Sequence, residues 1–420
     1  MADILLTRRQ LLGRAIGAAS GLAAAGAAAG AAGWAAWLVR KRRPPRTFGD
    51  PAPPANPHVR EAAYWKTACL GVQCELCPFQ CFLPEGGRGL CRVRMNTGGR
   101  LMTLVHSHPV SVHIDPIEKK PVFHLLPGSL IYSLAAAGCN LRCSFCQNWE
   151  ISQAFPEEAD RKAVIPRELR ILSVYGGMAQ ARVVSDEAGT LPPEEVVKAA
   201  RATHCKSIAY TYSEPVVFYE YVRDVAALAK KAGLRNVMVT AGYINPKPLA
   251  ELAPLFDVIK VDLKGFDEGF YRRMVGGELR FVLRTLVELR RLKAFCEVVN
   301  LVVPTLNDDP AQIKEMCAWV AANMGADTPV FFSRFHPQYK AQNIPPTPVE
   351  TLTLARDLGM KAGLRYVYVG NVPGHPGENT YCPKCKAVMV RRQGYAILEN
   401  RISPGGRCPN DGTRIPGIWG

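Results

Sequence analysis

Three cysteines lie close together in the stretch GCNLRCSFCQNW, residues 138–149. Cys139, Cys143 and Cys146 follow the spacing C-x3-C-x2-C, shortly after an apolar stretch. A [4Fe–4S] cube takes one thiolate per iron, so three thiolates leave one iron open to bind and activate a ligand. Two cysteines alone would be half of a zinc site. Three on one loop favour the open cluster over structural zinc or free thiols.

Two further cysteine groups flank this loop. In the head group, four thiols with Gly-rich turns between them suit tetrahedral Zn²⁺ or a closed second cluster, and we favour zinc because the module is small and separate. In the tail group, an Asp stands where a zinc ribbon has its fourth Cys, so a Cys3Asp zinc site and a degenerate, metal-free ribbon both stay open. The candidate ligands are Cys74, Cys77, Cys81 and Cys91 in the head, and Cys382, Cys385, Cys408 and Asp411 in the tail.

Composition sets the class of protein. The chain has 420 residues, 48% of them hydrophobic, which is enough for a barrel of about 250 residues with appendages. Clustered C-x2-C pairs are more typical of metal ligands in a reducing setting than of a disulfide framework. The net charge is +16. No long basic run with interleaved aromatic residues follows the N-terminal segment, so we do not expect nucleic acid to be a partner.

The N-terminal segment predicts a membrane anchor. Residues 15–39 form an apolar stretch of 25 residues, enough for a helix to span a bilayer of about 30 Å. Five basic residues follow this stretch and three precede it, which favours a cytoplasmic catalytic body. The stretch TRRQLL, with Arg8 and Arg9, also resembles a twin-arginine export signal. We favour an uncleaved anchor, with export as the alternative.

From residue 129 onward, strand and helix patterns alternate. Seven such strands with intervening helices predict an α/β fold with a parallel sheet, a partial (β/α)6-type TIM barrel just short of eight strands. Residues 156–190 fit no regular pattern and are interpreted as an insertion or lid. The predicted segments are a twin-arginine-like signal or transmembrane helix over 1–46, a Pro-rich linker over 47–64, a Cys-rich head over 65–128, the barrel over 129–372 and a zinc-ribbon-like tail over 373–420.

Several ionisable residues follow the predicted strands, at the edge where parallel βα barrels keep their sites. Glu214 ends TYSEP, Asp262 and Lys264 lie in KVDLKGF, and His336 lies in SRFHP. The alternatives are a solvated or helix-capping Glu, a surface ion pair and a structural His.

The cysteine spacing, with Phe145 before the last Cys, resembles the cluster loop of the radical S-adenosylmethionine (SAM) superfamily. In that family the amino and carboxylate groups of SAM chelate the fourth iron, and electron injection cleaves the sulfonium to a 5′-deoxyadenosyl radical. The resemblance implies that Phe145 lies near the adenine and Glu214 near the ammonium. Asp262 and Lys264 resemble the Asp-x-Lys pair of glycyl-radical-enzyme activases, whose Lys contacts the SAM carboxylate, and His336 resembles a cofactor-contacting His.

The body of the chain, about residues 65–420, resembles the radical enzyme of the AmmeMemoRadiSam system, which is similar to pyruvate formate-lyase activating enzymes. The motifs are CELCPFQC, DPIEKKPVFH, AGCNLRCSFCQNWEIS, DLKGF, SRFHP and GNVPGHPGENTYCPKC. The resemblance implies a [4Fe–4S] cluster and SAM, and makes Memo-like and AMMECR-like proteins candidate partners or substrates. The chain departs from this subgroup in its membrane-type N-terminus and in Asp411. Thr240 departs from the activases, which tend to have an acid there, and this puts a monovalent-cation site in doubt.

The predicted function is therefore reductive cleavage of SAM, followed by hydrogen abstraction from an unknown substrate, a protein residue being one candidate. A cytoplasmic electron donor is expected as a further partner, and no catalytic residue is assigned. The alternatives are activation of a glycyl-radical enzyme, a zinc-stabilised scaffold that docks partners at a membrane, and a membrane electron carrier.

Overall fold

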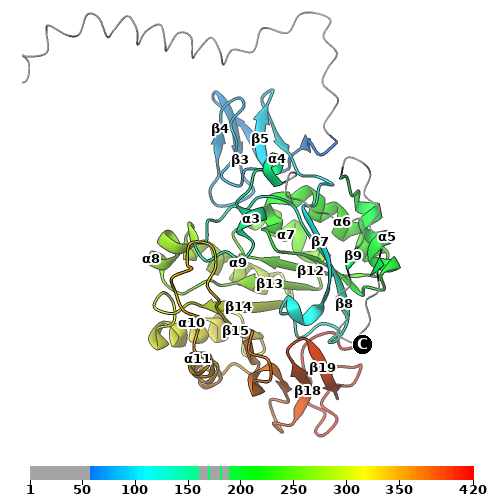
Figure 1. Ribbon diagram of the computed structural model, residues 1–420, viewed down its shortest axis with the longest axis vertical. Helices are drawn as coiled ribbons and strands as arrows, with labels where there is room; N and C mark the ends of the chain where they lie inside the picture. Colours follow the sequence, from blue (N-terminus) through cyan, green and yellow to red (C-terminus); the bar gives the residue numbers. More distant parts are fainter. Residues whose placement is uncertain (1–56, 160–168, 171–179, 182–188) are drawn as a thin grey trace, which may run out of the picture. The chain divides into compact units, whose positions relative to one another are not determined.

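The computed structural model describes residues 57–159, 169–170, 180–181 and 189–420 (Figure 1). These residues belong to one compact unit, Asn56–Gly420. Most of the predicted lid lies outside the described residues, so its role in shaping access stays a prediction.

The predictions of an N-terminal hydrophobic helix and a membrane anchor require correction. Within the described ranges, no helix is long and apolar enough to cross a membrane. Residues 1–46, to which the anchor and the twin-arginine signal were assigned, lie outside those ranges. The sequence signal itself is weak, because the stretch 15–39 is mostly Ala and Gly and holds four of the Leu, Ile, Phe and Val residues that favour insertion most.

An eight-stranded sheet forms the centre of the compact unit, in the order β16-β15-β14-β13-β12-β11-β8-β7. Seven strands are parallel, and β7 pairs antiparallel with β8 at one edge (Figure 1). The strands are β7 Ser111–Pro116, β8 Leu130–Ala135, β11 Ser207–Tyr210, β12 Arg235–Thr240, β13 Val258–Asp262, β14 Cys296–Val302, β15 Val330–Arg334 and β16 Val367–Gly370.

Six crossovers carry helices between the parallel strands, so the predicted α/β alternation is confirmed. The sheet stays open, since β16 and β7 do not pair. The crossover helices are α5 Pro193–Ala202, α6 Tyr219–Lys231, α7 Pro246–Leu252, α9 Leu279–Arg291, α10 Pro310–Asn323 and α11 Val349–Lys361. The shorter elements are η1 Ile117–Lys119, α3 Trp149–Ser152, α4 Pro156–Ala159, β9 Leu169–Arg170, β10 Gln180–Ala181, η2 Pro215–Phe218, η3 Ala253–Leu255, α8 Glu268–Phe270 and the π-helix η4 Tyr271–Val275.

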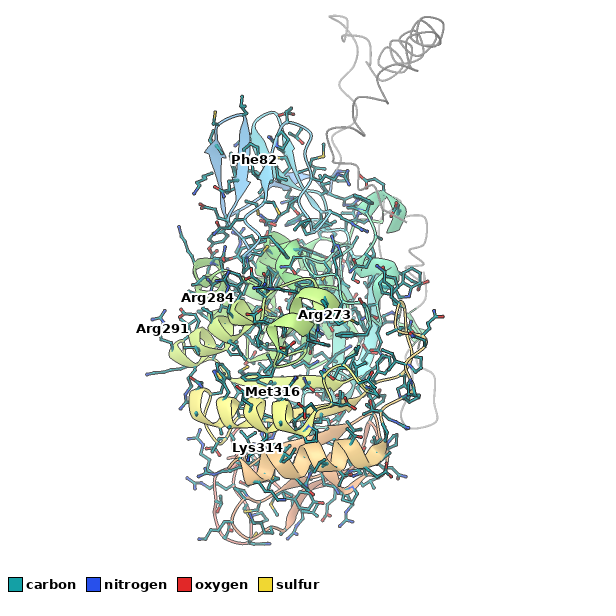
Figure 2. All side chains as sticks on the ribbon, turned by 90° about the vertical axis from the view of Figure 1, so that its left-hand side faces the viewer. Phe82, Arg273, Arg284, Arg291, Lys314 and Met316 are labelled. Atoms are coloured by element: carbon teal, nitrogen blue, oxygen red, sulfur yellow. The ribbon has the colours of Figure 1, made fainter. Side chains whose placement is uncertain are left out.

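The helices are amphipathic and cover the sheet with their apolar faces. In α10, Met316 is buried and Lys314 is exposed, and Arg291 at the end of α9 is exposed as well (Figure 2). Asp309 begins α10 by accepting a hydrogen bond from the Ala311 N–H at 3.0 Å. Basic residues such as these account for part of the surplus positive charge as a solvated surface.

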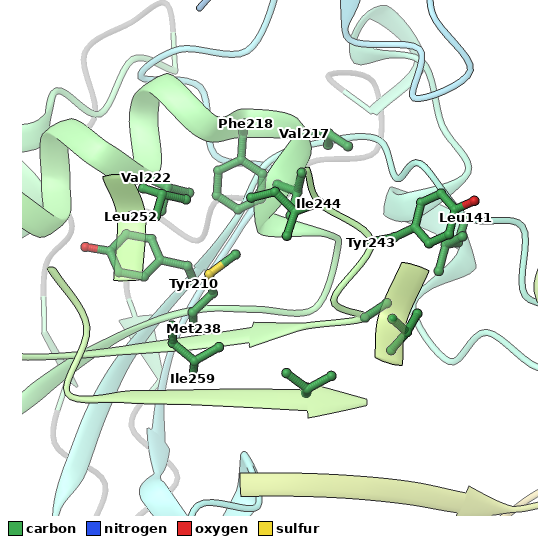
Figure 3. Packing of buried hydrophobic residues seen from close by; sticks show 14 of the residues in the cluster. Leu141, Tyr210, Val217, Phe218, Val222, Met238, Tyr243, Ile244, Leu252 and Ile259 are labelled. Carbon is green, nitrogen blue, oxygen red and sulfur yellow. The ribbon is translucent and has the colours of Figure 1, made fainter. Parts of the chain in front are cut away.

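The largest buried cluster joins the helices, the sheet and the loop that follows β8. Val222 of α6 and Leu252 of α7 lie over Met238 and Ile259 of the sheet (Figure 3). Leu141 belongs to the same cluster, so the cysteine loop is anchored in the core. A loop fixed in this way can hold its side chains in one geometry.

The head and tail are small antiparallel modules. Two three-stranded sheets build the head, from β2 Trp65–Ala68, β3 Gly71–Cys74 and β4 Phe82–Leu83, and from β1 Arg60–Glu61, β6 Arg100–Thr103 and β5 Arg94–Thr97. The tail contains η5 Pro376–Glu378 and a sheet of β17 Thr380–Tyr381, β18 Val388–Gln393 and β19 Ala396–Asn400. The central eight-stranded sheet begins within the segment predicted as head, because its edge strand β7 lies there.

Candidate active site

A cavity of about 820 Å³ lies where the parallel strands end. Side chains at or just after the ends of β8, β11, β12, β13, β14, β15 and β16 line it. The predicted residues among them are Cys139, Cys143, Phe145, Cys146, Glu214, Asp262 and Lys264. The structure therefore brings seven of the eight predicted cluster and cofactor residues to one space, at the edge where such folds keep their sites.

Backbone hydrogen bonds tie the cysteine loop, residues 138–149, to the π-helix η4. The backbone N–H groups of Arg142 and Ser144 donate to carbonyl oxygens of Val275 and Met274 at 2.9 and 2.8 Å. π-Helical turns are rare and often lie at functional sites. These bonds fix the path of the backbone between the three cysteines.

Burial raises the pKa of two thiols of the cysteine loop, those of Cys139 and Cys143. The pKa of Cys143 rises to about 12, although the nearby Lys264 ammonium opposes the rise. The pKa of Cys139 is also raised by burial and then by the carboxylate of Glu214. Free thiols here would stay protonated, whereas a coordinated metal deprotonates its thiol ligands.

The donor set of the cavity fits a cluster with one open iron. Among the described residues that line it, Cys139, Cys143 and Cys146 are the only cysteines, and no histidine is present. Three thiolates can hold three irons of a [4Fe–4S] cube, and the remaining space can admit a ligand to the fourth.

Asp262 and Lys264 are not a surface ion pair. Lys264 Nζ lies 2.7 Å from Asp262 Oδ2, and Lys260 Nζ lies 2.7 Å from Asp262 Oδ1. Burial alone would raise the pKa of the Asp262 carboxyl, but the two ammonium groups hold it well below its usual range. Burial likewise opposes the charge of Lys264, but Asp262 and the Cys143 thiol raise its pKa above the usual value. The pair thus presents a fixed cation beside the cysteines.

Glu214 caps a helix and lines the cavity at once. Its carboxylate accepts hydrogen bonds from Val216 N at 3.2 Å, Thr240 Oγ1 at 2.6 Å and Ala241 N at 2.8 Å. Burial raises the pKa of Glu214. Thr240, which stands where the activases tend to have an acid, here positions the carboxylate of Glu214.

Phe145 and His336 differ in their placement. Phe145 is 3% exposed, and its ring stacks on Phe270 with the ring centroids 6.0 Å apart. Its side chain therefore offers a rigid apolar wall next to the cysteines. His336 is exposed and does not line the cavity, so the structure does not bring it to the other predicted residues.

Comparison with known proteins fits this geometry. The family model described as the radical SAM superfamily matches residues 134–319, which include the cysteine loop and the strands that carry Glu214, Asp262 and Lys264. The chain belongs to the radical SAM superfamily. Radical SAM enzymes use a [4Fe–4S] cluster and SAM, so the predicted enzyme class and both cofactors are confirmed.

The radical SAM chain has relatives of two kinds. An uncharacterized protein from Methanocaldococcus jannaschii is 42% identical over 359 residues, which cover 85% of this chain and 99% of that protein. A pyruvate formate-lyase-activating enzyme from Clostridium pasteurianum is 22% identical over 180 residues, covering 43% of this chain and 64% of the enzyme. The predicted similarity to such activating enzymes is thereby confirmed.

Solved structures show weaker similarity. A domain of a pyruvate-formate lyase-activating enzyme from Bacteroides vulgatus has a TM-score of 0.36 at 13% identity, covering 39% of this chain and 99% of the domain. A radical SAM methyltransferase from Sphaerobacter thermophilus has a TM-score of 0.42 at 14% identity, covering 60% of this chain and 71% of that enzyme.

A charged group beside the cavity of this radical SAM protein carried no predicted role: Lys119, Lys120 and Tyr212 line the cavity, and Asp115 holds them. Asp115 of β7 binds the ammonium groups of Lys119 at 2.8 Å and Lys120 at 2.5 Å, and it accepts a hydrogen bond from the Tyr212 hydroxyl. Burial lowers the pKa of Lys120 to about 8, although Asp115 opposes the change. The motif DPIEKKPVFH contains three of these residues, but its pattern alone assigns them no chemistry.

The tail ligands lie together. The candidate ligand atoms of Cys382, Cys385, Cys408 and Asp411 all fall within 4.8 Å of one another. Cys385 Sγ and Cys408 Sγ are 3.7 Å apart, and Asp411 Oδ2 is 3.5 Å from Cys382 Sγ. Four tetrahedral ligands of one ion at about 2.3 Å have sulfur atoms roughly 3.8 Å apart. The arrangement therefore fits a single Zn²⁺.

The four head cysteines lie around a separate, smaller cavity. Cys74 and Cys91 are buried, and Cys77 and Cys81 are half-buried. None of them reaches the cavity that holds the cysteine loop.

Proposed function

We propose that this radical SAM enzyme is the radical component of an AmmeMemoRadiSam system, with Memo-like and AMMECR-like proteins as its partners or substrates. The observation that carries the proposal is the single cavity that joins the cysteine loop with Glu214, Asp262 and Lys264. The long co-linear motifs support the assignment to this subgroup. The match to the M. jannaschii protein runs over 359 residues and so extends beyond the parallel sheet.

The residues divide into a cofactor end and a substrate end. Cys139, Cys143 and Cys146 would hold the [4Fe–4S] cluster, which, when bound and reduced, supplies the electron that splits SAM into methionine and a 5′-deoxyadenosyl radical. Lys264 would donate a charge-assisted hydrogen bond to the carboxylate of SAM, while Asp262 holds the Lys264 ammonium in place. Phe145 would lie next to the adenine.

Glu214 is a positioning residue as much as a ligand. Its two oxygens are already engaged by Thr240 and Ala241, so the ends of β11 and β12 keep the carboxylate in one orientation. A carboxylate held in this way can accept one more bond, from the ammonium of SAM.

The substrate end carries Lys120, Asp115 and Tyr212. The ammonium of Lys120 lies 3.1 Å from the Tyr212 hydroxyl and 4.3 Å from the centroid of its ring. Tyr395, from the turn between β18 and β19, also lines the cavity, so the tail contributes to this wall. We propose that a protein residue enters here, since the cavity is large and Lys120, Tyr212 and Tyr395 line it.

We further propose a structural zinc in the tail, held by three thiolates and the Asp411 carboxylate. The ligand atoms fit one ion, and no position is left open, as in other closed structural sites. Zinc here would stabilise the module that carries Tyr395.

The test is anaerobic reconstitution with dithionite as the reductant, SAM, and Memo-like and AMMECR-like proteins prepared in deuterated form. We expect deuterium in the 5′-deoxyadenosine formed, and only when the true substrate protein is present. A glycyl radical detected on a pyruvate formate-lyase-type enzyme, with no deuterium transfer from the other proteins, would instead support the activase alternative. Transfer from neither would overturn the assignment to this system while leaving SAM cleavage intact.

A further inference from the structure

The head contains a small cavity of its own. Cys74, Cys77, Cys81 and Cys91 all line it, together with apolar side chains, and it measures about 20 Å³. The four thiols are therefore gathered around one space.

The three cysteine groups of the chain differ in the spacing of their sulfur atoms. Among the residues that the structure describes, the tail set is the one group of three or more His, Cys, Asp or Glu ligands whose atoms all lie within 4.8 Å. The cysteine loop that holds the [4Fe–4S] cluster does not meet this spacing, and neither does the head. The head thus resembles the iron–sulfur site and differs from the zinc-type site.

We propose that the head holds a second, closed [4Fe–4S] cluster, ligated by Cys74, Cys77, Cys81 and Cys91, where the sequence alone favoured zinc. One thiolate is available for each iron, so no iron is left to bind SAM. The proposal concerns a different site from the one that carries the proposed function, and it holds whichever substrate the enzyme acts on.

Arg94 is a second observation that points to a charged group in this cavity. Its side chain lines the cavity, is 1% exposed, and places Nη1 4.0 Å from Cys74 Sγ. Its guanidinium pairs with Glu220, but its Nε has no partner among the described protein atoms. A buried donor beside cysteine sulfurs stabilises the negative charge of a thiolate-ligated cluster.

The head site adjoins the cysteine loop. Gly138 has φ +91°, and a Cβ there would lie 2.5 Å from the Cys91 carbonyl oxygen, so only glycine permits this approach. Arg142 of the loop donates a hydrogen bond to the carbonyl of Leu90. Asn140 lines the head cavity, while its neighbour Cys139 lines the active-site cavity. Residues 138–142 therefore connect the two metal sites.

This placement would let the head cluster act as an electron relay. It would take up one electron from an external one-electron reductant such as dithionite, which is oxidised, and would return to its oxidised state by passing that electron to the cluster of the cysteine loop.

The test is metal and sulfide analysis of the full chain purified without oxygen. A second cluster predicts about eight iron atoms and eight sulfides per chain, with about one zinc in the tail. Zinc in the head predicts about four iron atoms and two zinc ions instead, and free head thiols predict about four iron atoms and one zinc. Either of the last two results would overturn the proposal.

Two variants make the assignment site by site. The triple variant Cys139→Ala, Cys143→Ala, Cys146→Ala should keep about four iron atoms and an electron paramagnetic resonance signal that added SAM does not change. The variant Cys77→Ala, Cys81→Ala should keep about four iron atoms and a signal that SAM does change. Cys317→Ala, which removes a buried thiol of α10, is the matched control and should keep the full iron content. Complete loss of iron in the triple variant, with circular dichroism unchanged, would refute a head cluster.

Discussion

The tail and the head each present four candidate ligands, and each begins with a C-x2-C pair, yet they enclose different spaces. In the tail, the four ligand atoms lie within 4.8 Å of one another. In the head, four cysteines line a cavity of about 20 Å³. The difference teaches that the backbone between the cysteines, more than the C-x2-C pair itself, selects one ion or a cluster.

The cysteine loop supplies the reference for this comparison. It has one thiol fewer than the head and opens onto a cavity of about 820 Å³. Four thiols in the head and an open set of three in the cysteine loop therefore adjoin each other through residues 138–142. The open set carries the chemistry because only a set of three thiolates leaves one iron free to bind SAM.

The largest expected effect is the loss of the open cluster. Cys143→Ala should abolish iron binding at the cysteine loop, because two thiolates cannot hold the cube, and 5′-deoxyadenosine should fall below detection after dithionite reduction. The measurement is chromatography of the reaction products. Cys205→Ala is the control, since it removes a buried thiol that lines neither the active-site cavity nor the head cavity. Retained cleavage in the Cys143 variant would refute the cluster assignment.

The next largest effect concerns the affinity for SAM, which only the open site of the cysteine loop should bind. Lys264→Met should weaken SAM binding by about ten- to a hundredfold, since a charge-assisted hydrogen bond contributes about 1.5–3 kcal/mol. Iron content should not change, because Asp262 keeps Lys260 as its partner at 2.7 Å.

Anaerobic equilibrium dialysis with SAM gives the affinity of this variant. Lys314→Met is the matched control, because Lys314 is exposed on α10. An unchanged affinity for SAM would show that Lys264 does not face the cofactor.

The sequence predicts those site residues that follow the strands of the βα pattern. Glu214, Asp262 and Lys264 could be predicted, because parallel strands present their carboxyl ends at one edge and an ionisable residue that follows a strand pattern is therefore a site candidate. Asp115 and Lys120 could not be predicted, because β7 joins the sheet antiparallel from outside the βα pattern. His336 follows β15 by two residues, and the pattern does not tell which way a side chain turns beyond a strand.

The sequence predicted the cluster of the cysteine loop but left the metals of the head and the tail open. Spacing along the chain limits which cysteines can meet, but the separation of their sulfur atoms decides between one ion and a cube. In the tail, the pairing of Asp411 with Cys382 could be expected only as one of two possibilities. The structure brings the two side chains to 3.5 Å.

The tail side of the comparison predicts a loss of stability with chemistry retained. Cys385→Ala should release the tail zinc and lower Tm, by roughly 2–4 °C for each kcal/mol of stability lost. SAM cleavage should persist, because Cys385 lies outside the active-site cavity. Asp411→Cys should keep the zinc, since four thiolates form a closed site. Normal Tm and zinc content in the Cys385 variant would contradict a tail site.

The smallest effect concerns the joint between the tail and the sheet. Glu297 of β14 accepts hydrogen bonds from the backbone N–H groups of Phe123 and His124 at 3.2 and 3.1 Å. Trp419 of the tail packs in the same cluster as Phe123. Burial raises the pKa of Glu297 to about 7, although these N–H groups oppose the change.

The sign of the pH effect follows from this raised pKa. A carboxyl whose pKa is higher in the folded than in the unfolded state stabilises the fold below the unfolded value near 4.5, and this contribution is lost as pH rises through about 7. The wild-type protein should therefore lose about 1–3 kcal/mol of its free energy of unfolding between pH 5 and pH 8, and Glu297→Gln should not show this loss. The measurement is Tm against pH for both proteins at constant zinc. Parallel curves would show that Glu297 keeps its charge when buried, in which case this joint is held by an ionised carboxylate at every pH tested.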